Sequence, residues 1–377
     1  MDAERAKVEG AGKRVVEETD RLLREARARG ASDLHLDPNA DGLHVLFRLD
    51  GVLHESEVLP PGMTRPVVAR LKFLADLMTY RSDIPQEGRL GGSDADGKGD
   101  LRVSTFPTIQ GERAVVRFFD GRSAAFTLDG LGFPPDALGD LRQVLSATSG
   151  VVLLTGPAGS GKTTTLYACL SEISGRRAGR TQVITVEDPV ESVLAGITQT
   201  QVNPGAGLTY AAALRSLLRQ DPEVLMVGEI RDRETAEIVI QAGLTGHLVL
   251  STLHGGDVAT VIARLLDMGI ETYSVTSAVR AVLAMRLARR LCVRCAGETG
   301  GCETCSGTGY AGRLPIVEFS GVAGGLRKLI LASADREALS RELAKGGMRT
   351  LRERARELVS AGRTSAAEVE RVLGPEA

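Results

Sequence analysis

The chain has 377 residues, of which 43% are apolar and 25% are charged, and its formal net charge is −2. This length predicts two or three domains with a sizeable core. The near-neutral charge gives no indication of a polyanion-binding surface, so no direct contact with nucleic acid is expected. No run of 18 apolar residues occurs, and the N-terminus lacks a basic segment followed by an apolar run, so we expect neither a membrane span nor a secretory signal.

The first part of the chain has the pattern of a small α/β domain. Apolar residues recur at helical spacing over residues 15–26, and Gly30 is a natural stop for that helix. Residues 43–49 alternate between apolar and other side chains and run into Asp50-Gly51, which predicts a tight turn. A β-hairpin is therefore expected around this dipeptide.

The same domain continues with a helix predicted over residues 65–80 and a polar loop over residues 91–100. Two strands are predicted after the loop, over residues 101–106 and 113–119, with a turn at Gly111. These elements predict an antiparallel sheet within residues 1–120.

Beyond a Gly- and Pro-rich segment at 121–135, expected to be a linker, the pattern changes. Short apolar runs now alternate with helical segments, at residues 151–155, 183–186, 224–227 and 248–251. Such runs are typical of a parallel sheet that helices cover on both faces. The tail from residue 335 is predicted to be helical, and Ser365 with Glu368 fits a capping box at the start of the last helix.

A Gly-rich segment directly after the run 151–155 fits the P-loop pattern. Its glycines let the main chain wrap closely, so that N–H groups point at phosphate oxygens. Lys162 is expected to reach the β- and γ-phosphates of ATP, and the Thr163 hydroxyl to bind Mg²⁺. The strand before the segment and the helix after it argue against a chance match. The predicted nucleotide-binding residues are Gly156, Pro157, Ala158, Gly159, Ser160, Gly161, Lys162, Thr163 and Thr164.

Two acidic residues, Glu229 and Glu187, come just after apolar runs and are candidates for holding the metal ion and orienting the attacking water. Taken alone, each would be an exposed acid at a strand end, but a P-loop upstream favours the catalytic interpretation. His254 follows the run 248–251, at the edge of the sheet where nucleotide-facing loops lie. It is either a sensor of the γ-phosphate or a packing residue, as His247 at the start of that run is expected to be.

Four of the five cysteines lie within fourteen residues. The spacing Cys292-x2-Cys295-x6-Cys302-x2-Cys305 is typical of a structural zinc site with four thiolate ligands. Free thiols or a redox pair are the alternatives. Cys169, on the helix after the P-loop, is expected to be a buried core thiol.

Taken together, these features resemble the type II secretion and type IV pilus assembly ATPases (the GspE/PilB group). The resemblance extends from Ala31-Ser32-Asp33-Leu34-His35 to the C-terminal helices. Residues 184–191 (ITVEDPVE) resemble the family's acidic box. Residues 217–222 (LLRQDP) with 228–232 (GEIRD) resemble its Walker B region, and residues 245–247 (TGH) with 251–254 (STLH) resemble its histidine box.

The resemblance implies a PAS-like α/β domain over residues 1–120, a linker at 121–135 and a RecA-like ATPase domain over 136–377. Within the ATPase domain, residues 289–314 are expected to form a zinc-binding subdomain and residues 325–377 a helical C-terminal region.

The resemblance also implies a hexamer in which ATP is held between the two domains and arginines of the first domain approach the phosphates. Arg89 and Arg102 lie in the matching segments, and Arg117 is a third candidate. A planar guanidinium suits this role because it neutralises charge on the transferring phosphoryl group; without the resemblance, surface ion pairs would be expected. Glu229 is expected to polarise or position the water, and Glu187 to support its placement and that of the metal.

Three departures from the family accompany the resemblance. The loop between the cysteine pairs has six residues where the family's is longer, and Gly255-Gly256 stands where the family has Thr-Asn. The module that precedes the PAS-like domain in the family is expected to be missing from this chain. The zinc knuckle itself favours the secretion and pilus-assembly branch, because pilus-retraction ATPases lack it.

The expected function is that of an ATP-hydrolysing motor for pilus or pseudopilus assembly or type II protein secretion, using ATP, Mg²⁺ and Zn²⁺. The expected partners are identical subunits, an inner-membrane platform protein and cytoplasmic docking components, with the motor in the cytoplasm at the inner membrane. Two alternatives stay open: a DNA-uptake or conjugation motor of the same superfamily, and a zinc-stabilised nucleotide-binding scaffold with little turnover.

Overall fold

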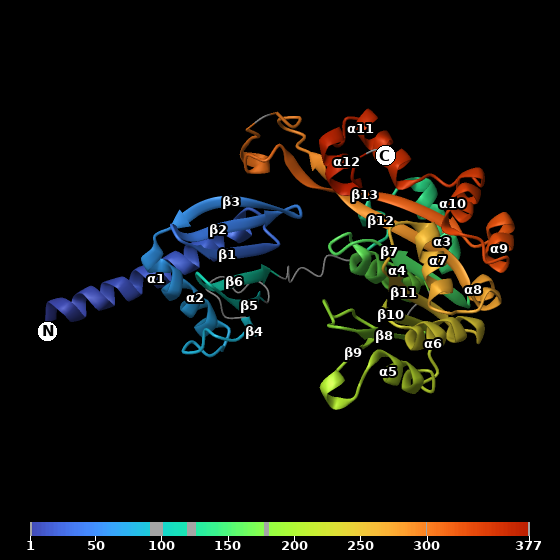
Figure 1. Cartoon of the computed structure of the whole chain (residues 1–377), viewed down its shortest axis with the longest axis horizontal. Helices are drawn as coiled ribbons and strands as arrows, with labels where there is room; N and C mark the ends of the chain where they lie inside the picture. The colour runs from blue at the N-terminus through green and yellow to red at the C-terminus, as the bar shows by residue number, and fades with distance from the viewer. Residues whose placement is uncertain (1, 91–100, 119–125, 177–180, 299, 376–377) are drawn as a thin grey trace. The chain divides into compact units, whose positions relative to one another are not determined.

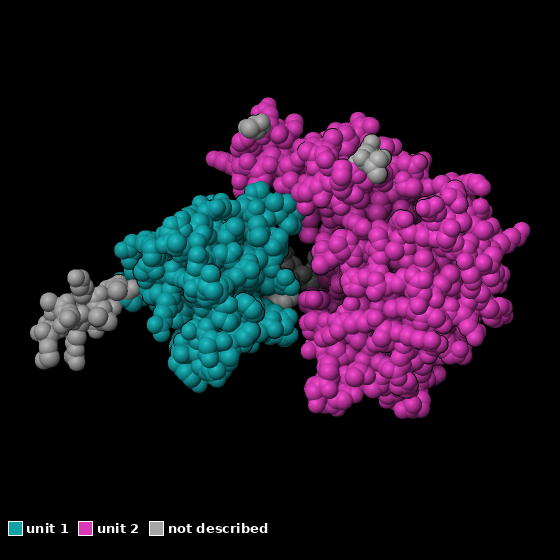
Figure 2. All heavy atoms as spheres, viewed as in Figure 1, with its two compact units in different colours: residues 1–124 teal, residues 125–377 magenta. Residues whose placement is uncertain are grey.

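The computed structural model describes, with side chains from residue 12 onward, residues 2–90, 101–118, 126–176, 181–298 and 300–375. The chain forms two compact units, residues 1–124 and 125–377 (Figures 1 and 2). Each unit has its own β-sheet and its own apolar core. The polar loop expected at 91–100 lies outside the described residues.

The first unit is built on a six-stranded sheet in which every neighbouring pair is antiparallel, in the order β3-β2-β1-β6-β5-β4. Its strands are β1 (Asp33–Asn39), β2 (Gly42–Leu49), β3 (Val52–Leu59), β4 (Gln86–Leu90), β5 (Leu101–Thr108) and β6 (Gly111–Phe118). Apolar side chains of α1 (Asp2–Ala28) and α2 (Pro61–Leu74) share one core with alternate residues of the strands. The other face of the sheet is left for polar side chains, because successive residues of a strand point to opposite faces.

The structure confirms the hairpin at Asp50-Gly51, whose φ angles of 48° and 88° are those of a tight turn between β2 and β3. The prediction of a helix over 65–80 is wrong at both ends. The helix begins at Pro61, since proline is well suited to the first helical position, and it ends at Leu74. Two strands, β1 and β4, were not predicted. β1 does alternate, but over only two apolar residues, Leu34 and Leu36, and β4 has a single apolar residue, so both signals are short.

A buried ion pair fastens the chain after α2 to the sheet. Lys72 Nζ donates to both carboxylate oxygens of Glu112 on β6, at 2.8 and 2.9 Å, and also to the carbonyl of Arg81. The side chains of Lys72 and Glu112 are only 1% and 10% exposed. This contact fixes the segment that leads into β4, the strand on which Arg89 lies.

We expect Lys72→Met to destabilise the first unit by about 3–5 kcal/mol, because the Glu112 carboxylate would lose its counter-charge while it stays buried. The urea dependence of amide hydrogen exchange in the strands of this unit measures the effect. The exposed ion-pairing residue Lys13 provides the control, since Lys13→Met should change little. The double variant Lys72→Met with Glu112→Leu should recover most of the lost stability, because it leaves no buried charge unpaired. A stability of Lys72→Met within about 1 kcal/mol of wild type would contradict the prediction.

The second unit contains a seven-stranded sheet in the order β13-β12-β7-β11-β10-β8-β9. All neighbouring pairs are parallel except β12 with β13. The strands are β7 (Gly150–Thr155), β8 (Val183–Glu187), β9 (Thr198–Gln201), β10 (Val224–Ile230), β11 (Leu248–Leu253), β12 (Val279–Leu291) and β13 (Tyr310–Gly321). The four predicted apolar runs are thus confirmed as parallel strands; β9, β12 and β13 were not predicted.

Helices cover both faces of this sheet, as a parallel sheet requires (Figure 1). One face packs on α3 (Pro135–Leu145) and α4 (Lys162–Arg176), and the remaining helices pack on the other face or along the outer strands. These are α5 (Tyr210–Leu217), α6 (Arg233–Leu244), α7 (Val258–Asp267), α8 (Thr272–Ala278), α9 (Gly324–Leu331), α10 (Arg336–Lys345), α11 (Leu351–Ser360) and α12 (Ala366–Leu373). The expected fold class, a RecA-like domain preceded by a small α/β domain, is confirmed.

The second unit extends further toward the N-terminus than the sequence indicates. Leu128 and Phe133 lie in the segment expected to be a linker, yet both are buried in the core beside α3. Their burial explains why the described part of this segment, residues 126–135, packs on the second unit although it contains Gly and Pro. The helical tail predicted from residue 335 is confirmed, with Asp335 as the N-cap of α10.

Candidate functional site

The P-loop forms a tight cradle between β7 and α4. Gly159 and Gly161 have φ angles of 72° and 93°, in the left-handed region that glycine adopts without strain. A side chain at Gly156 would place its Cβ 2.4 Å from the carbonyl oxygen of Met285 on β12 and 2.5 Å from Ser160 Oγ. The cradle therefore needs glycine at this position, because the neighbouring strand lies directly against it.

Lys162, the first residue of α4, bends back over the cradle. Its Nζ donates to the carbonyl oxygens of Gly156 and Pro157, each at 2.8 Å. Burial lowers the pKa of Lys162, although the charge of Glu229 acts in the opposite direction. Within the described residues no carboxylate forms an ion pair with this ammonium group, so its charge is available to an anion in the cradle.

The remaining cradle residues fit a magnesium–triphosphate. Ser160 Oγ is buried and finds no hydrogen-bond partner within the described part of the chain. Thr163 and Thr164 are exposed on the first turn of α4, where main-chain N–H groups attract anions, and Pro157 and Ala158 form the exposed rim. The hydroxyl of Thr163 has the position in the motif that binds Mg²⁺.

Glu229 lies at the end of β10, which β11 separates from β7. Arg231 Nε donates to its Oε1 at 2.8 Å, and His254 Nε2 lies 3.3 Å from its Oε2. Burial alone would raise the pKa of Glu229, but the contacts with Arg231 and then His254 outweigh it and lower that pKa. The structure thus brings Glu229 and His254 together as an ionised carboxylate beside an imidazole.

Arg231 was given no role from the sequence, although it lies in the 228–232 motif, yet it joins three parts of the site. Its guanidinium contacts Glu229, lies 3.3 Å from Asp188 Oδ2 and stands 5.9 Å from the ring centroid of Tyr210. The available signal was its spacing, since residues two apart on an extended chain lie on the same side. Tyr210 gave no such signal, because tertiary packing alone brings α5 to this place.

Glu187 is held more tightly than Glu229. Its buried carboxylate accepts hydrogen bonds from Tyr167 Oη (2.5 Å), Thr185 Oγ1 (2.5 Å) and Gln199 Nε2 (3.0 Å). Both β10 and β11 lie between its strand and β7, a separation of roughly 14 Å at the usual strand spacing. Since Tyr167 is on α4, Glu187 links the P-loop helix to β8.

The two histidines of this unit mark opposite ends of β11. His247 Nδ1 lies 3.1 Å from the carbonyl of Ala242, at the end of α6, and so contributes to packing. His254 lies at the other end, beside Glu229. Of the two, only His254 shares the edge of the sheet that carries the P-loop.

The first unit carries a row of arginines on the polar face of its sheet. Strand register places Arg89 directly opposite Arg102, and Arg102 directly opposite Arg117. Arg102 pairs with Glu87, and Arg117 Nε donates to the buried Asp33 at 2.9 Å. Like charges on directly opposed residues are unfavourable by themselves, so the row favours an anion as its partner.

The four clustered cysteines have the geometry of a metal site. Their sulfur atoms all lie within 4.8 Å of one another, and three of the sulfur–sulfur distances are 3.7, 3.8 and 3.9 Å. A tetrahedral ion with metal–sulfur bonds of about 2.3 Å requires roughly 3.8 Å between sulfurs. Burial would raise the pKa of the Cys305 thiol, but N–H donors of Cys302 and Gly309 lower it to about 6. The four residues therefore fit a divalent ion with thiolate ligands.

The comparison with known proteins agrees with this geometry. The family model described as type II/IV secretion system protein matches residues 9–371. The chain belongs to this family.

Individual relatives of this secretion ATPase cover most of the chain. It is 41% identical to the type II secretion system protein HxcR of Pseudomonas aeruginosa over 96% of this chain and 78% of the relative. It is also 41% identical to the type IV pilus assembly ATPase PilB of Myxococcus xanthus, over 90% of this chain and 64% of the relative.

None of the described helices is both long and apolar enough to cross a bilayer.

Solved structures share the fold. The pilus retraction motor PilT with bound ADP superposes with a TM-score of 0.65, at 24% identity, over 95% of this chain and 97% of that chain. The ATPase DotB of Legionella pneumophila gives a TM-score of 0.68 at 20% identity, over 93% and 94% of the two chains.

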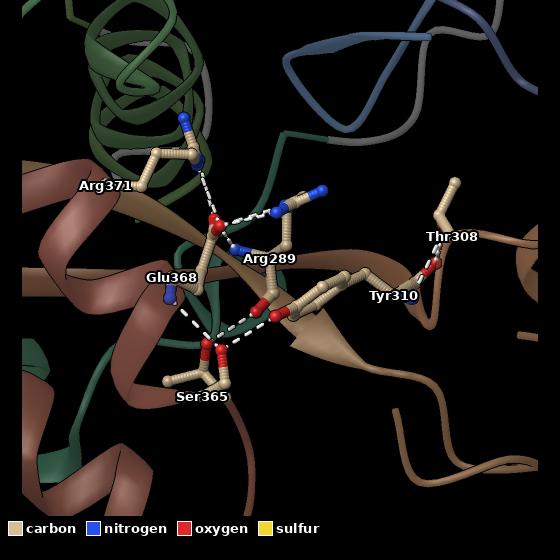
Figure 3. A network of polar contacts seen from close by, with 7 residues as sticks. Arg289, Thr308, Tyr310, Ser365, Glu368 and Arg371 are labelled. Carbon is tan, nitrogen blue, oxygen red and sulfur yellow. Dashed lines mark hydrogen bonds and ion pairs between the residues drawn. The ribbon is translucent and has the colours of Figure 1, made fainter. Parts of the chain in front are cut away.

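The last helix of the secretion ATPase clamps the base of the cysteine loop (Figure 3). Glu368 on α12 is fully buried and accepts hydrogen bonds from the guanidinium groups of Arg289 and Arg371. Arg289 also stands 4.1 Å from the ring centroid of Tyr310, whose hydroxyl lies 2.7 Å from Ser365 Oγ. Arg289 and Tyr310 belong to the two strands that enclose the cysteine loop, so α12 holds both.

This clamp corrects the predicted capping box. Ser365 accepts from the main-chain N–H of Glu368 at 3.1 Å, as expected of an N-cap. The Glu368 carboxylate, however, turns to Arg289 and Arg371 instead of returning to the cap, because charge-assisted bonds to guanidinium groups are stronger.

Glu368 is expected to make stability depend on acid pH. Burial would raise the pKa of Glu368, but Arg371 and Arg289 outweigh it and lower that pKa to about 2. A carboxyl with a depressed pKa stabilises the fold above its unfolded value, near 4.3, and loses this effect as pH falls toward 2. The advantage of wild type over Glu368→Gln should therefore be about 2–3 kcal/mol at pH 7 and shrink between pH 4.5 and 2.

Chemical unfolding of both proteins across this pH range, followed by hydrogen exchange in α12, measures the difference. The exposed Glu370 has no part in the clamp, so Glu370→Gln serves as the control and should show no such trend. An advantage that does not change with pH would contradict the assignment.

Proposed function

We propose that this secretion ATPase is a hexameric motor that uses hydrolysis of ATP to drive pilus or pseudopilus assembly or type II protein secretion at the inner membrane. The observation that carries the proposal is the P-loop cradle with Lys162, together with the Glu229–His254 pair at the same edge of the sheet. The relatives HxcR and PilB, which are named for type II secretion and type IV pilus assembly, support this choice of machine.

Five residues of the second unit have a role in this proposal, two in the cradle and three on neighbouring strands and loops. Lys162 exchanges its two carbonyl partners for phosphate oxygens, and Thr163 holds Mg²⁺, which neutralises charge on the phosphates. Glu229, kept ionised by its neighbours, orients the attacking water, and His254 senses the γ-phosphate. Glu187 acts more remotely, by fixing α4 through Tyr167.

The arginine row of the first unit is also given a role in this proposal. Arg89 and Arg102 are proposed to neutralise negative charge that develops on the transferring phosphoryl group, with Arg117 as a third contributor. Support comes from their register, which collects three guanidinium groups on one face of the sheet.

The cysteine cluster is proposed to bind Zn²⁺ as a structural ion, because four thiolates fill a tetrahedral shell and leave no position for water. The remaining proposed partners are an inner-membrane platform protein and cytoplasmic docking components, which would place the motor in the cytoplasm at the inner membrane. The relatives named HxcR and type II secretion system protein E belong to secretion systems by name, which supports placing the motor in a machine of that kind.

Substitution of Glu229 tests the motor proposal most directly. Glu229→Gln keeps the shape of the side chain but removes the charge that orients water, and kcat for Mg²⁺-dependent phosphate release should fall roughly 10²–10³-fold. Lys162→Ala should abolish turnover and weaken nucleotide binding, because the cradle loses its ammonium group. Phosphate release by the wild type should increase as hexamers form with rising protein concentration.

The control is Glu237→Gln, which removes an exposed carboxylate that pairs with Arg233 on α6. Its turnover should match the wild type. Full activity in both Glu229→Gln and Lys162→Ala would defeat the proposal. A wild-type hexamer that binds ATP but releases no phosphate over hours would instead favour the scaffold alternative.

Metal analysis tests the cysteine cluster. Purified protein should contain about one zinc per chain, and Cys302→Ser should lower the zinc content and increase hydrogen exchange over residues 292–309, because metal binding stabilises the loop. Cys169→Ala is the control, since Cys169 is buried on α4 outside the cluster and its loss should leave the zinc content unchanged. Fully stable protein without metal would refute the proposal.

A further inference from the structure

The loop that carries His254 has adjacent glycines at its centre, and its last residue, Asp257, is fixed by its own side chain, as the N-cap of α7 and as the partner of Arg336. Between β11 and α7 it reads His254-Gly255-Gly256-Asp257. Adjacent glycines have more conformational freedom than any other pair of residues. Nevertheless, His254 lies 3.3 Å from the Glu229 carboxylate, so something outside the loop must hold it in place.

Two hydrogen bonds to main-chain carbonyls hold the loop. Thr155 Oγ1, at the end of β7, donates to the carbonyl of Gly255 at 2.9 Å. Arg286 Nη2, on β12, donates to the carbonyl of Gly256 at 2.9 Å. Both donors belong to the strands that form the base of the P-loop, so the histidine loop and the phosphate cradle share one support.

Arg286 is well suited to this task. Its Nη1 donates to the carbonyl of Met285 at 2.9 Å, the same carbonyl that lies against Gly156. The side chain is half-buried, and in the described ranges it forms no ion pair with a carboxylate. The Arg286 guanidinium therefore donates to main-chain carbonyls on both sides of β7, those of Met285 and Gly256.

We infer that Arg286 is a positioning residue for ATP hydrolysis, which holds the His254 loop at a fixed distance from the P-loop through the Gly256 carbonyl. Its kinetic consequence rests on the proposed ATPase function. Its effect on the loop does not, because the hydrogen bond joins two parts of this chain.

The variant Arg286→Met keeps an unbranched apolar side chain but removes the donors. Amide hydrogen exchange over residues 254–257 should become about fivefold faster or more, because the Gly256 carbonyl loses its hydrogen bond to Arg286. The chain offers a matched control on the same strand: Arg280 Nε donates to the carbonyl of Ser149 at 3.1 Å, at the opposite end of β7. Arg280→Met should leave exchange in the His254 loop unchanged.

Kinetics separate positioning from a general structural role. In Arg286→Met, kcat should fall about tenfold while the Kd for a fluorescent ATP analogue stays within about twofold, and Arg280→Met should keep both values. If Arg286 acts through His254, adding His254→Ala to Arg286→Met should cause no loss beyond that of the more impaired single variant.

Unchanged exchange in the His254 loop of Arg286→Met would overturn the inference. The inference would also fail if the double variant lost kcat by the product of the two single losses, because the two residues would then act independently. A tenfold rise of the Kd for the ATP analogue in Arg286→Met would overturn it as well, because the guanidinium would then contact the nucleotide itself. A wild type that shows no turnover would defeat the proposed function alone, because the exchange experiment would still decide the role of Arg286.

Discussion

The site depends on the close contact between Gly156 and the main chain of β12. The Met285 carbonyl lies where any side chain at Gly156 would be, so the packing of β12 beside β7 requires glycine at the start of the P-loop. The same strand supplies Arg286 next to the cradle and, at its far end, leads directly into Cys292. One long strand thus connects the phosphate cradle, the support of the histidine loop and the cysteine cluster.

Electrostatics in the second unit separate two kinds of charged group. Lys162 and Arg286 satisfy their donors with main-chain carbonyls and have no carboxylate ion-pair partner among the described residues. Glu229 and Glu368, in contrast, are each held by guanidinium groups. Lys162 can accept an anion in the cradle without breaking an ion pair and Arg286 holds the histidine loop, whereas the carboxylates of Glu229 and Glu368 are already compensated. This difference distinguishes the cradle from the clamp at the base of the cysteine loop.

The first unit aligns its arginines through strand register. An antiparallel sheet with helices on one face leaves the other face polar, and the pairing of β4, β5 and β6 aligns three arginines across it. The buried pair of Lys72 and Glu112 fixes the segment before β4, and the buried Asp33 holds Arg117. Rigid support of this kind fits the role proposed for these arginines, which is to meet a phosphate in a defined geometry.

Sequence alone determined the features that depend on local spacing: the P-loop, the four cysteines, the hairpin at Asp50-Gly51 and the four apolar strands, since each is encoded by neighbours along the chain. The predicted roles of Glu229, Glu187, Arg89, Arg102 and His254 came from strand ends and from the family resemblance, and they stay predictions. Only the tertiary structure revealed that Arg231 and Tyr210 lie beside Glu229. It also showed that the Glu368 carboxylate binds two arginines instead of capping its own helix, and that Arg286 supports the histidine loop. These contacts join segments distant in sequence or choose between competing partners, and long-range packing decides both.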